Sequence, residues 1–368
     1  MKITDVKVYN LRYPLTDPFA NSIAWNTART AGVIEIITDA GVTGWGEGVS
    51  SLNETALRAR LVGRDPFDVE VIWNDLYLRG GVGFSELSAV DIALWDIVGR
   101  ALEMPIYRLL GGAFRNRIPA YASGLFLKRR SDMTRALSEE AASYVDRGFR
   151  AVKMKIGFGV DYDVRNTAAV RGAIGDSILL AVDANCGYDT GTAIHVGRRL
   201  LENDLLWFEE PISTDDVSGY REIRQALGVR VAGGEALQGR WAFRDLIQER
   251  GLDIVQPDIS DAGGFTECRR VAALASANHV RVLPHMWGTS IRLAATIHWQ
   301  ATLPDSPDTL NPFPSLFEFD MTENRLRTEL AKEPIKAVDG DVPVLQCPGL
   351  GIEIDRDVLE DHAVSGKA

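Results

Sequence analysis

The amino-acid sequence predicts an α/β protein in which a modified (β/α)8 (TIM) barrel carries an α+β capping domain. Three observations lead to this fold class. The chain has 368 residues, enough for a barrel of about 250 residues and a smaller domain. From residue 118 onward, short runs rich in Val, Ile and Leu alternate with amphipathic segments, as in the βαβ units of a parallel sheet. Charged residues end most of these runs at a nearly constant interval.

Residues 1–117 differ from this pattern, and we expect them to form the N-terminal α+β part of the capping domain. Segments 2–13 and 31–49 have the composition of strands, with a turn at 39–41. The glycines of GVTGWGEG, residues 41–48, lack a following helix and a phosphate-binding context, so they indicate a turn and a bulge. Helical periodicity covers 54–61, 66–78 and 85–102.

We expect the barrel in residues 118–320, because eight β-rich runs occur there. Eight strand–helix units suggest a closed barrel whose active site lies where the carboxyl ends of the strands meet. Residues 321–368 should then pack back on the capping domain, with one further strand at 349–355. The eight runs are 118–123, 151–156, 179–184, 205–210, 229–235, 254–258, 280–285 and 316–320, and the helical segments include 190–203, 215–227, 239–250 and 264–278.

The composition excludes several classes of partner. The formal net charge is −11, from 51 acidic and 40 basic residues, and such a field repels a nucleic-acid backbone. No apolar run reaches the roughly 18–20 residues of a membrane span, and the N-terminal residues lack the apolar core of a signal peptide. The three cysteines are odd in number and far apart, which is typical of a reducing compartment. We therefore expect a cytoplasmic protein that binds neither nucleic acid nor membranes.

Three carboxylates at the ends of consecutive runs are the strongest chemical signal. Asp183 and Glu209 are 26 residues apart, and so are Glu209 and Glu235. In a barrel these residues face one cavity, and oxygen ligands without His or Cys are the set that Mg²⁺ prefers. A single carboxylate of this kind is more often solvated, but three in register favour a metal site. Glu209 and Glu210 point to opposite faces of their strand, and the pattern does not decide which one enters the cavity.

Candidate proton-transfer groups end other runs. Lys153 and Lys155 end the second run and point the same way, because side chains alternate along a strand. If they face inward, each cation and a bound metal would lower the pKa of a lysine toward use as a base. His285 ends the seventh run and Asp258 the sixth, so the carboxylate can orient the imidazole. Glu318 ends the eighth run and could donate to an oxyanion if protonated, or bind a hydroxyl group.

Several short motifs together resemble the enolase superfamily, in its mandelate racemase and muconate-lactonizing branch. They are SAVDIALWDIVGR and LLGG, followed by KMK, DAN, EEP, GGE, QPD and the histidine of LPHMWGT. None of them is specific alone, but together they span essentially the whole chain. The resemblance implies a capping domain over a modified barrel, and an isomerase or lyase that removes the proton next to a substrate carboxylate.

The resemblance also assigns a role to each candidate side chain. It implies a Mg²⁺ cofactor, a base on each face of the substrate, a group that orients the second base, and a hydrogen-bond partner for the substrate carboxylate. The corresponding residues are Asp183, Glu209 (the first residue of EEP) and Glu235 for the metal; Lys155, with Lys153 beside it, and His285 for the two bases; Asp258 for the orienting group; and Glu318 for the carboxylate partner.

Within that branch, KIGFGV, the DAN-x-GY frame, AGGE, GGF and PHxWGT resemble galactarolactone cycloisomerases, which act on aldarolactones. One position departs from this resemblance, because Cys186 stands where a histidine is expected. We expect Asn185 and Cys186 to contact the substrate. We also expect the segment 17–27 of the capping domain, with Trp25 and Asn26, to form a specificity loop over the mouth.

Four functions remain open on the sequence. The first is removal of the α proton followed by β-elimination of the ring oxygen of a sugar lactone. Dehydration of an open acid sugar is an alternative, because only the leaving group changes, and racemisation or epimerisation is another, because two bases suit it. The fourth is an inactive sugar-acid binding protein, and the complete set of Lys, Asp, Glu and His residues argues against it. Each has a small-molecule sugar acid or lactone as partner, and the resemblance suggests a homo-oligomer.

Overall fold

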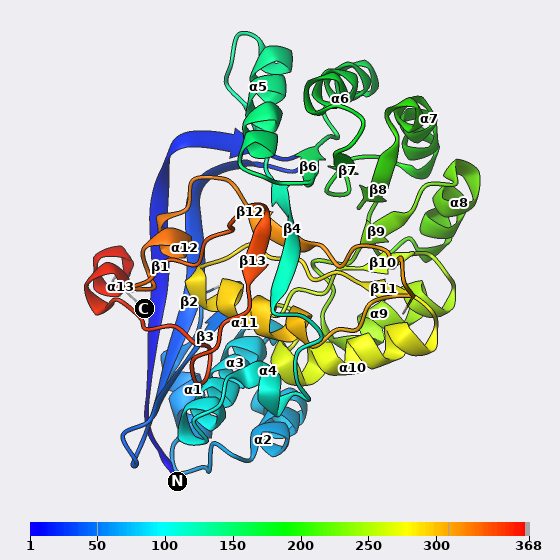
Figure 1. Cartoon of the computed structure of the whole chain (residues 1–368). Helices are drawn as coiled ribbons and strands as arrows, with labels where there is room; N and C mark the ends of the chain where they lie inside the picture. Colours follow the sequence, from blue (N-terminus) through cyan, green and yellow to red (C-terminus); the bar gives the residue numbers. More distant parts are fainter. Residues whose placement is uncertain (50, 308, 365–368) are drawn as a thin grey trace.

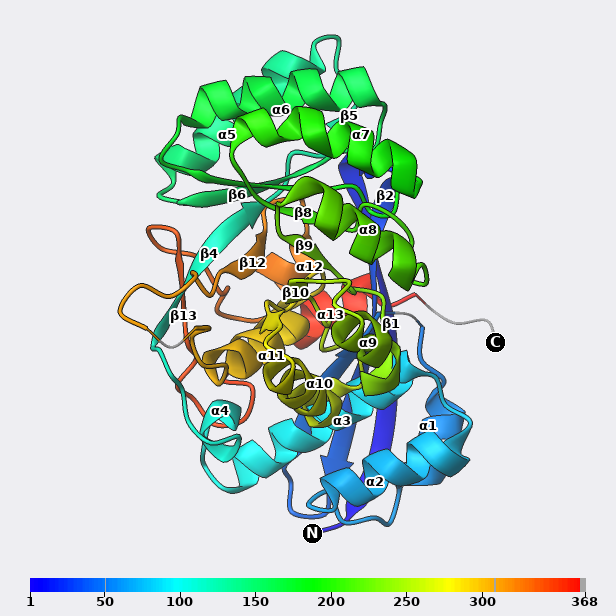
Figure 2. The ribbon, with the colours of Figure 1, turned by 90° about the vertical axis from the view of Figure 1, so that its right-hand side faces the viewer.

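The computed structural model describes residues 1–49, 51–307 and 309–364, and it joins an antiparallel sheet to a curled parallel sheet (Figure 1). The antiparallel sheet, with strand order β3-β2-β1-β5, forms the centre of the capping domain. Helices α1 to α3 lie at the same end of the molecule (Figure 2). The bounds are β1 Ile3–Ala20, β2 Trp25–Thr38, β3 Thr43–Gly48, β5 Leu127–Lys128, α1 Glu54–Leu61, α2 Val69–Asp75 with its π-helical continuation η1 Leu76–Gly80, and α3 Phe84–Ala101.

Helix α3 packs directly on the glycines of β3, which are alternate residues and share one face of the strand. A Cβ atom at Gly46 would lie 1.9 Å from the carbonyl oxygen of Ala89, and Gly44 and Gly48 face the same helix at similarly short range. The expected bulge is wrong, because β2 and β3 pair without a register shift. Glycine is required here because the helix backbone approaches the strand so closely.

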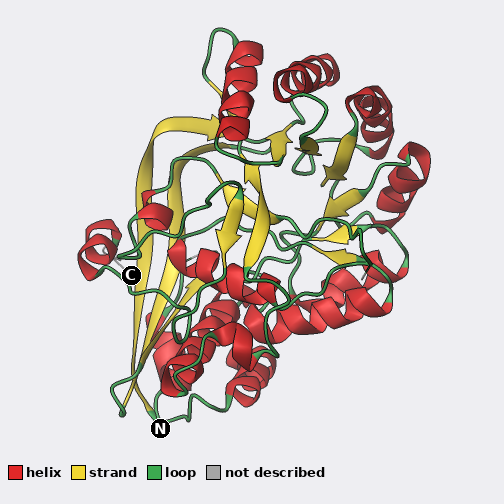
Figure 3. Cartoon of the chain, in the orientation of Figure 1, coloured by secondary structure: helices red, strands yellow, loops and turns green. Residues whose placement is uncertain are grey.

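Eight parallel strands form the curled sheet, in the order β11-β10-β9-β8-β7-β6-β4-β12. Each predicted run contains one of them, so the eight strands are confirmed. Helices surround these strands (Figure 3), and no described helix is both long and apolar enough to cross a membrane. The bounds are α4 Ile106–Leu109, β4 Arg117–Ser123, α5 Met133–Asp146, β6 Ala151–Lys155, α6 Val160–Ile174, β7 Leu179–Asp183, α7 Thr190–Leu200, η2 Leu201–Asn203, β8 Leu205–Glu209, α8 Val217–Leu227, β9 Val231–Gly233, α9 Gly239–Gln248, β10 Ile254–Val255, α10 Gly264–Ala277, β11 Arg281–Val282, α11 Ser290–Ala301, β12 Phe317–Asp320, α12 Arg325–Thr328, β13 Asp341–Pro343 and α13 Arg356–His362.

The ring of strands differs from a closed barrel at one seam. Within the described ranges, the backbone ladder ends at β11 on one side and at β12 on the other. Side chains span this seam: the Met286 N–H donates to Glu318 Oε2 at 3.1 Å, and the Gln300 amide donates to the Leu316 carbonyl at 3.0 Å. The expected fold class, a modified barrel with an α+β capping domain, is confirmed, and in the described part of the chain its strands form a curled parallel sheet whose backbone ladder does not close between β11 and β12.

The C-terminal segment returns to both sheets. Strand β13 pairs with β4 in the antiparallel sense, and helix α13 lies beside β1 (Figure 1). The strand expected at 349–355 is wrong, because only isolated bridges form there, at Gly349 and Ile354. Gly349 and Gly351 have positive φ angles of 66° and 74°, and such residues interrupt an extended run.

Replacing Gly46 with Ala should destabilise the protein, because the added methyl group collides with the backbone of α3. Overpacking of this kind costs about 1–3 kcal/mol. Gly172→Ala in α6 is the matched control, since nothing lies within 4 Å of its added Cβ and alanine is the better helix former. Thermal unfolding should show a lower Tm for the first variant and an equal or higher Tm for the second. A Gly46 variant as stable as the wild type would contradict this packing.

Candidate active site

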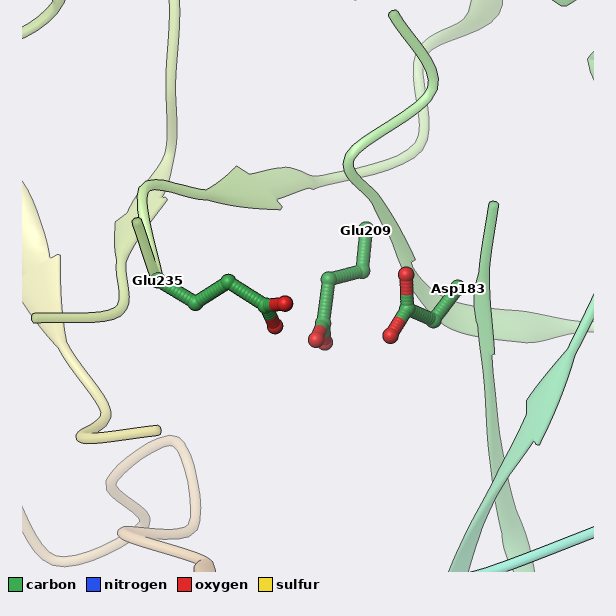
Figure 4. A group of neighbouring side chains, drawn as sticks. All are labelled: Asp183, Glu209 and Glu235. Atoms are coloured by element: carbon green, nitrogen blue, oxygen red, sulfur yellow. The ribbon is translucent and has the colours of Figure 1, made fainter. Parts of the chain in front are cut away.

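Three carboxylates from successive strands converge at the mouth of the curled sheet (Figure 4). Asp183 ends β7, Glu209 ends β8, and Glu235 follows the end of β9. One oxygen of each lies within 4.8 Å of the other two. Glu235 Oε2 is buried and has no hydrogen-bond partner among the described residues. An all-oxygen donor set in which one buried oxygen accepts no hydrogen bond from a described residue fits a hard divalent cation such as Mg²⁺.

Lys153 and Lys155 of β6 point inward and neutralise these carboxylates. Lys155 Nζ contacts Asp183 Oδ2 directly. Lys153 Nζ contacts Glu209 and lies 2.8 Å from Glu318 Oε1. Burial acts to lower the pKa of Lys155, but Asp183, Glu235 and Glu209 together outweigh burial and raise that pKa. The low lysine pKa expected beside a bound cation stays a prediction.

Of the neighbours Glu209 and Glu210, the structure turns Glu209 toward the other carboxylates. Trp207 Nε1 and Gln256 Nε2 each donate to Glu209 Oε2 at 2.8 Å, which fixes its orientation. Glu210 has a left-handed backbone, with φ 38°, and accepts a hydrogen bond from the Gly234 N–H instead. Burial raises the pKa of Glu209 to about 7 and that of Glu210 to about 8, and neighbouring carboxylates add to both shifts. The carboxylates at this point therefore repel one another, and a bound cation would relieve that repulsion.

His285 and Asp258 form a hydrogen-bonded dyad at another part of the mouth. His285 Nδ1 lies 2.6 Å from Asp258 Oδ2, and a parallel bridge joins the two backbones. The other ring nitrogen, Nε2, is 3.4 Å from Glu235 Oε2. Four strands, β7 to β10, separate β6, which carries Lys155, from β11, which precedes His285. The imidazole and the lysine therefore reach the carboxylates from different sides.

Glu318 on β12 is buried among hydrogen-bond donors. Ser123 Oγ donates to its Oε1 at 2.7 Å, and the Met286 N–H donates to its Oε2 at 3.1 Å. Burial acts to raise its pKa, but Lys153 and then His285 outweigh burial and hold the pKa well below its ordinary range. The lowered pKa favours Glu318 as an acceptor for a substrate hydroxyl group, which is one of the two roles expected for it. Its role as hydrogen-bond partner of the substrate carboxylate stays a prediction.

Asn185 and Cys186 follow β7 in left-handed backbone conformations, with φ 39° and 60°. Asn185 Nδ2 donates to Glu235 Oε1 at 3.3 Å, so this side chain joins the carboxylate group. The Cys186 thiol points to Glu210 Oε2, at 3.6 Å. Burial and then Glu210 raise the pKa of the Cys186 thiol. The thiol is therefore neutral and lies beside the metal candidates without the properties of a nucleophile.

The segment 17–27 is the tip of the β1–β2 hairpin and not an irregular loop. Asn26 is paired with Phe19 in this hairpin. Trp25 is 41% exposed and lies under the Arg129 guanidinium, 5.0 Å from the ring centroid. Phe19 is the hairpin aromatic that reaches the mouth, where it packs against other rings.

Phe126, Trp287 and Arg292 also lie at the mouth and were not predicted as site residues, and Ser22 lies within the predicted segment 17–27 but was not singled out there. The Ser22 hydroxyl lies 2.6 Å from the Ala184 carbonyl oxygen, which joins the hairpin tip to the end of β7. Phe126 and Trp287 contact each other and Phe19, and Lys155 Nζ lies 5.2 Å from the Phe126 ring centroid. Arg292 contacts Asp258. The sequence held two signals for these residues. Trp287 lies within the motif LPHMWGT. Gly157 and Gly187 mark where the backbone approaches Ser22, because a Cβ atom at either position would collide with it.

Two family models match the chain and together cover most of it. The mandelate racemase / muconate lactonizing enzyme N-terminal domain matches residues 3–111, and the enolase C-terminal domain-like model matches residues 136–358. The chain therefore belongs to the mandelate racemase and muconate lactonizing enzyme family of the enolase superfamily. The resemblance inferred from its short motifs is confirmed.

Individual relatives have names of sugar-acid enzymes. D-galactarolactone cycloisomerase from Agrobacterium fabrum (strain C58) is 40% identical over 98% of each chain. Arabinonate dehydratase from Saccharolobus solfataricus is 33% identical over 89% of each chain. The crystal structure of a racemase from Streptomyces coelicolor A3(2) with bound magnesium has a TM-score of 0.87 and 31% identity, and covers 98% of this chain and 100% of that one. The expected enzyme class is confirmed, and magnesium occurs within this fold.

Proposed function

We propose that this enzyme removes the proton α to the carboxylate of a sugar lactone or sugar acid and then eliminates the oxygen on the β carbon, as a galactarolactone cycloisomerase would. One observation carries the proposal: Lys155 and the His285–Asp258 dyad reach the same group of carboxylates from different sides. A substrate carboxylate bound there would have its α carbon between two proton-transfer groups. The names of the relatives support the substrate class.

Asp183, Glu209 and Glu235 would hold a Mg²⁺ ion in this mechanism. When bound, the ion supplies positive charge that stabilises the enediolate form of the substrate. If Asp183 binds a metal, its ion pair with Lys155 would weaken, and the pKa of the lysine would fall toward the range of a base. The carboxylate that holds the lysine proton would thus also control its release.

The remaining steps belong to side chains of the mouth. One of Lys155 and His285 takes the α proton, and the other donates a proton to the leaving oxygen. Asp258 holds the imidazole by its Nδ1, so that Nε2 faces the substrate. Glu318 accepts a hydrogen bond from a substrate hydroxyl group. The hairpin tip, anchored by Ser22, covers the mouth and limits the entry of water.

Dehydration of an open acid sugar is the second candidate, and Cys186 is the observation that favours it. Its thiol occupies the position where the lactone-enzyme resemblance leads to a histidine, three residues after Asp183, and it points to Glu210. The two reactions differ only in whether the leaving oxygen belongs to a ring. Racemisation would use the same two bases without a leaving group. We further propose, as expected for such an enzyme, a cytoplasmic homo-oligomer whose partner is a small-molecule sugar acid or lactone.

Glu235→Gln should weaken Mg²⁺ binding, because an amide is a poorer ligand for a hard cation than a carboxylate. We expect the affinity for Mg²⁺ to fall by more than the roughly 10–100-fold that follows removal of a residue that only supports a metal ligand. Isothermal titration with Mg²⁺ measures the binding without substrate. Glu267→Gln is the matched control and should bind normally, since Glu267 is a buried carboxylate in the first turn of α10, paired with Arg240. Turnover that persists in metal-free enzyme would contradict a magnesium mechanism.

Assays with D-galactarolactone in deuterated water distinguish the roles of the two bases, because they measure exchange of the α proton and formation of the product. The wild type should release a 2-keto-3-deoxy acid, detected by NMR. One of Lys155→Ala and His285→Ala should abolish exchange of the α proton, with a loss of at least about 10²–10⁴-fold. The other should slow product formation but retain exchange, because the enediolate can still form and return.

Other products would identify other functions. Inversion at the α carbon without elimination would refute the proposal and favour a racemase. Turnover of open galactarate without turnover of its lactone would favour the dehydratase. Full activity in both the Lys155 and His285 variants would show that neither residue transfers the proton.

A further inference from the structure

We infer that Arg292 is a positioning residue for the His285–Asp258 dyad, and that Glu47 of the capping domain holds Arg292 in place. The inference rests on the proton-transfer role proposed above for His285. It extends that proposal, because it makes a buried carboxylate of the capping domain part of the support for a base on the parallel sheet.

Arg292 links Asp258 to the loop that carries His285. It lies in the first turn of α11 and is 5% exposed. Its Nη2 contacts Asp258 Oδ2, the same oxygen that lies 2.6 Å from His285 Nδ1. Its Nη1 donates to the Trp287 carbonyl at 2.7 Å. Because the guanidinium is planar and rigid, it fixes the carboxylate relative to the loop that carries the imidazole.

These contacts leave the Asp258 carboxylate little freedom to rotate. Its Oδ1 accepts a hydrogen bond from the Ser260 N–H at 2.8 Å, and its Oδ2 is shared by the imidazole and Arg292. Burial lowers the pKa of Arg292 to about 10, which leaves the guanidinium charged at neutral pH. The orientation of the imidazole therefore depends on a carboxylate that is anchored at both oxygens.

Glu47 reaches from β3 to the N-terminus of α11 and is 1% exposed. It accepts hydrogen bonds from the N–H groups of Thr289 and Arg292, each at 3.0 Å, and from the Thr289 hydroxyl. A negative charge at this end of a helix is favourable, because the first N–H groups have no partner within the helix. The carboxylate thus fixes the turn from which the Arg292 side chain extends.

Gly288 makes this arrangement possible. A Cβ atom at this position would lie 2.4 Å from Glu47 Oε1 and 2.4 Å from Arg292 Cδ. Both charged side chains therefore pass over the backbone of residue 288, three residues after His285. Glycine is therefore required at this position of LPHMWGT, because a larger residue would collide with both side chains. These side chains connect the capping domain to the loop that carries His285.

A structural ion pair and a positioning contact have different consequences. Loss of a structural ion pair lowers stability and reduces every partial reaction in proportion to the folded fraction. Loss of a positioning contact changes the reaction step of the residue that it positions. Arg292 is buried behind Asp258, so its removal should reduce kcat and leave KM nearly unchanged.

The test compares Arg292→Met and Glu47→Gln with the control Glu267→Gln. Glu267 is a fully buried carboxylate that accepts hydrogen bonds from the N–H and the side chain of Arg240, at the start of α9. In D-galactarolactone and deuterated water, Arg292→Met should reproduce the exchange pattern of His285→Ala and not that of Lys155→Ala. We expect kcat to fall roughly 10–100-fold. Glu267→Gln should keep the wild-type pattern.

A second readout needs no substrate. With ¹⁵N-labelled histidine, the chain gives signals from five imidazoles, and His285→Ala identifies those of His285. Arg292→Met and Glu47→Gln should shift the His285 nitrogen resonances and leave those of His195 and His279 in place. Glu47→Gln preserves side-chain volume, so it carries the same test if Arg292→Met does not fold.

Two results would overturn the inference. The first is an equal loss of the Lys155- and His285-dependent steps in folded Arg292→Met and Glu47→Gln. The second is a set of His285 resonances that neither variant shifts. If His285→Ala instead retains full exchange and turnover, the proposed function fails, and the imidazole resonances still decide whether Arg292 orients the ring.

Discussion

The register of the parallel ladder from β6 to β8 is the constraint on which the rest of the site depends. In this ladder Lys155 lies beside Asp183, and Asp183 lies beside Glu209. A shift of one residue would turn each of these side chains to the other face of the sheet. The equal spacing of Asp183, Glu209 and Glu235 along the chain repeats the same strand–helix unit. The chemistry of the mouth is thus a direct consequence of how the strands pair.

The balance of buried charge is the second constraint. Asp183, Glu209 and Glu318 are no more than 2% exposed, and Lys153 reaches all three. Leaving one of them unpaired would cost about 3–5 kcal/mol, so this lysine stabilises the fold as well as the site. Glu235 keeps an oxygen without a hydrogen-bond partner. The negative charge that Lys153 and Lys155 leave uncompensated is the charge that a divalent cation would neutralise.

The sequence predicted the features that repeat along the chain and missed those that join distant segments. Strand runs and the convergence of their end residues follow from periodicity, and so does the inward direction of Lys155. The open seam was not predictable, because it depends on where pairing stops in β11. The glycines of β3 have the composition of a turn, and the sequence alone does not show the helix that packs on them. Glu47 and Arg292 are 245 residues apart, so no local pattern connects them.

Anomalous diffraction from a crystal of the enzyme soaked with Mn²⁺ tests the central claim most directly, because Mn²⁺ takes the same oxygen ligands as Mg²⁺. We expect a peak bounded by carboxylate oxygens of Asp183, Glu209 and Glu235, with Lys155 and His285 on different sides of it. A peak elsewhere, or no metal at these carboxylates under conditions that support turnover, would show that these three residues do not form the metal site.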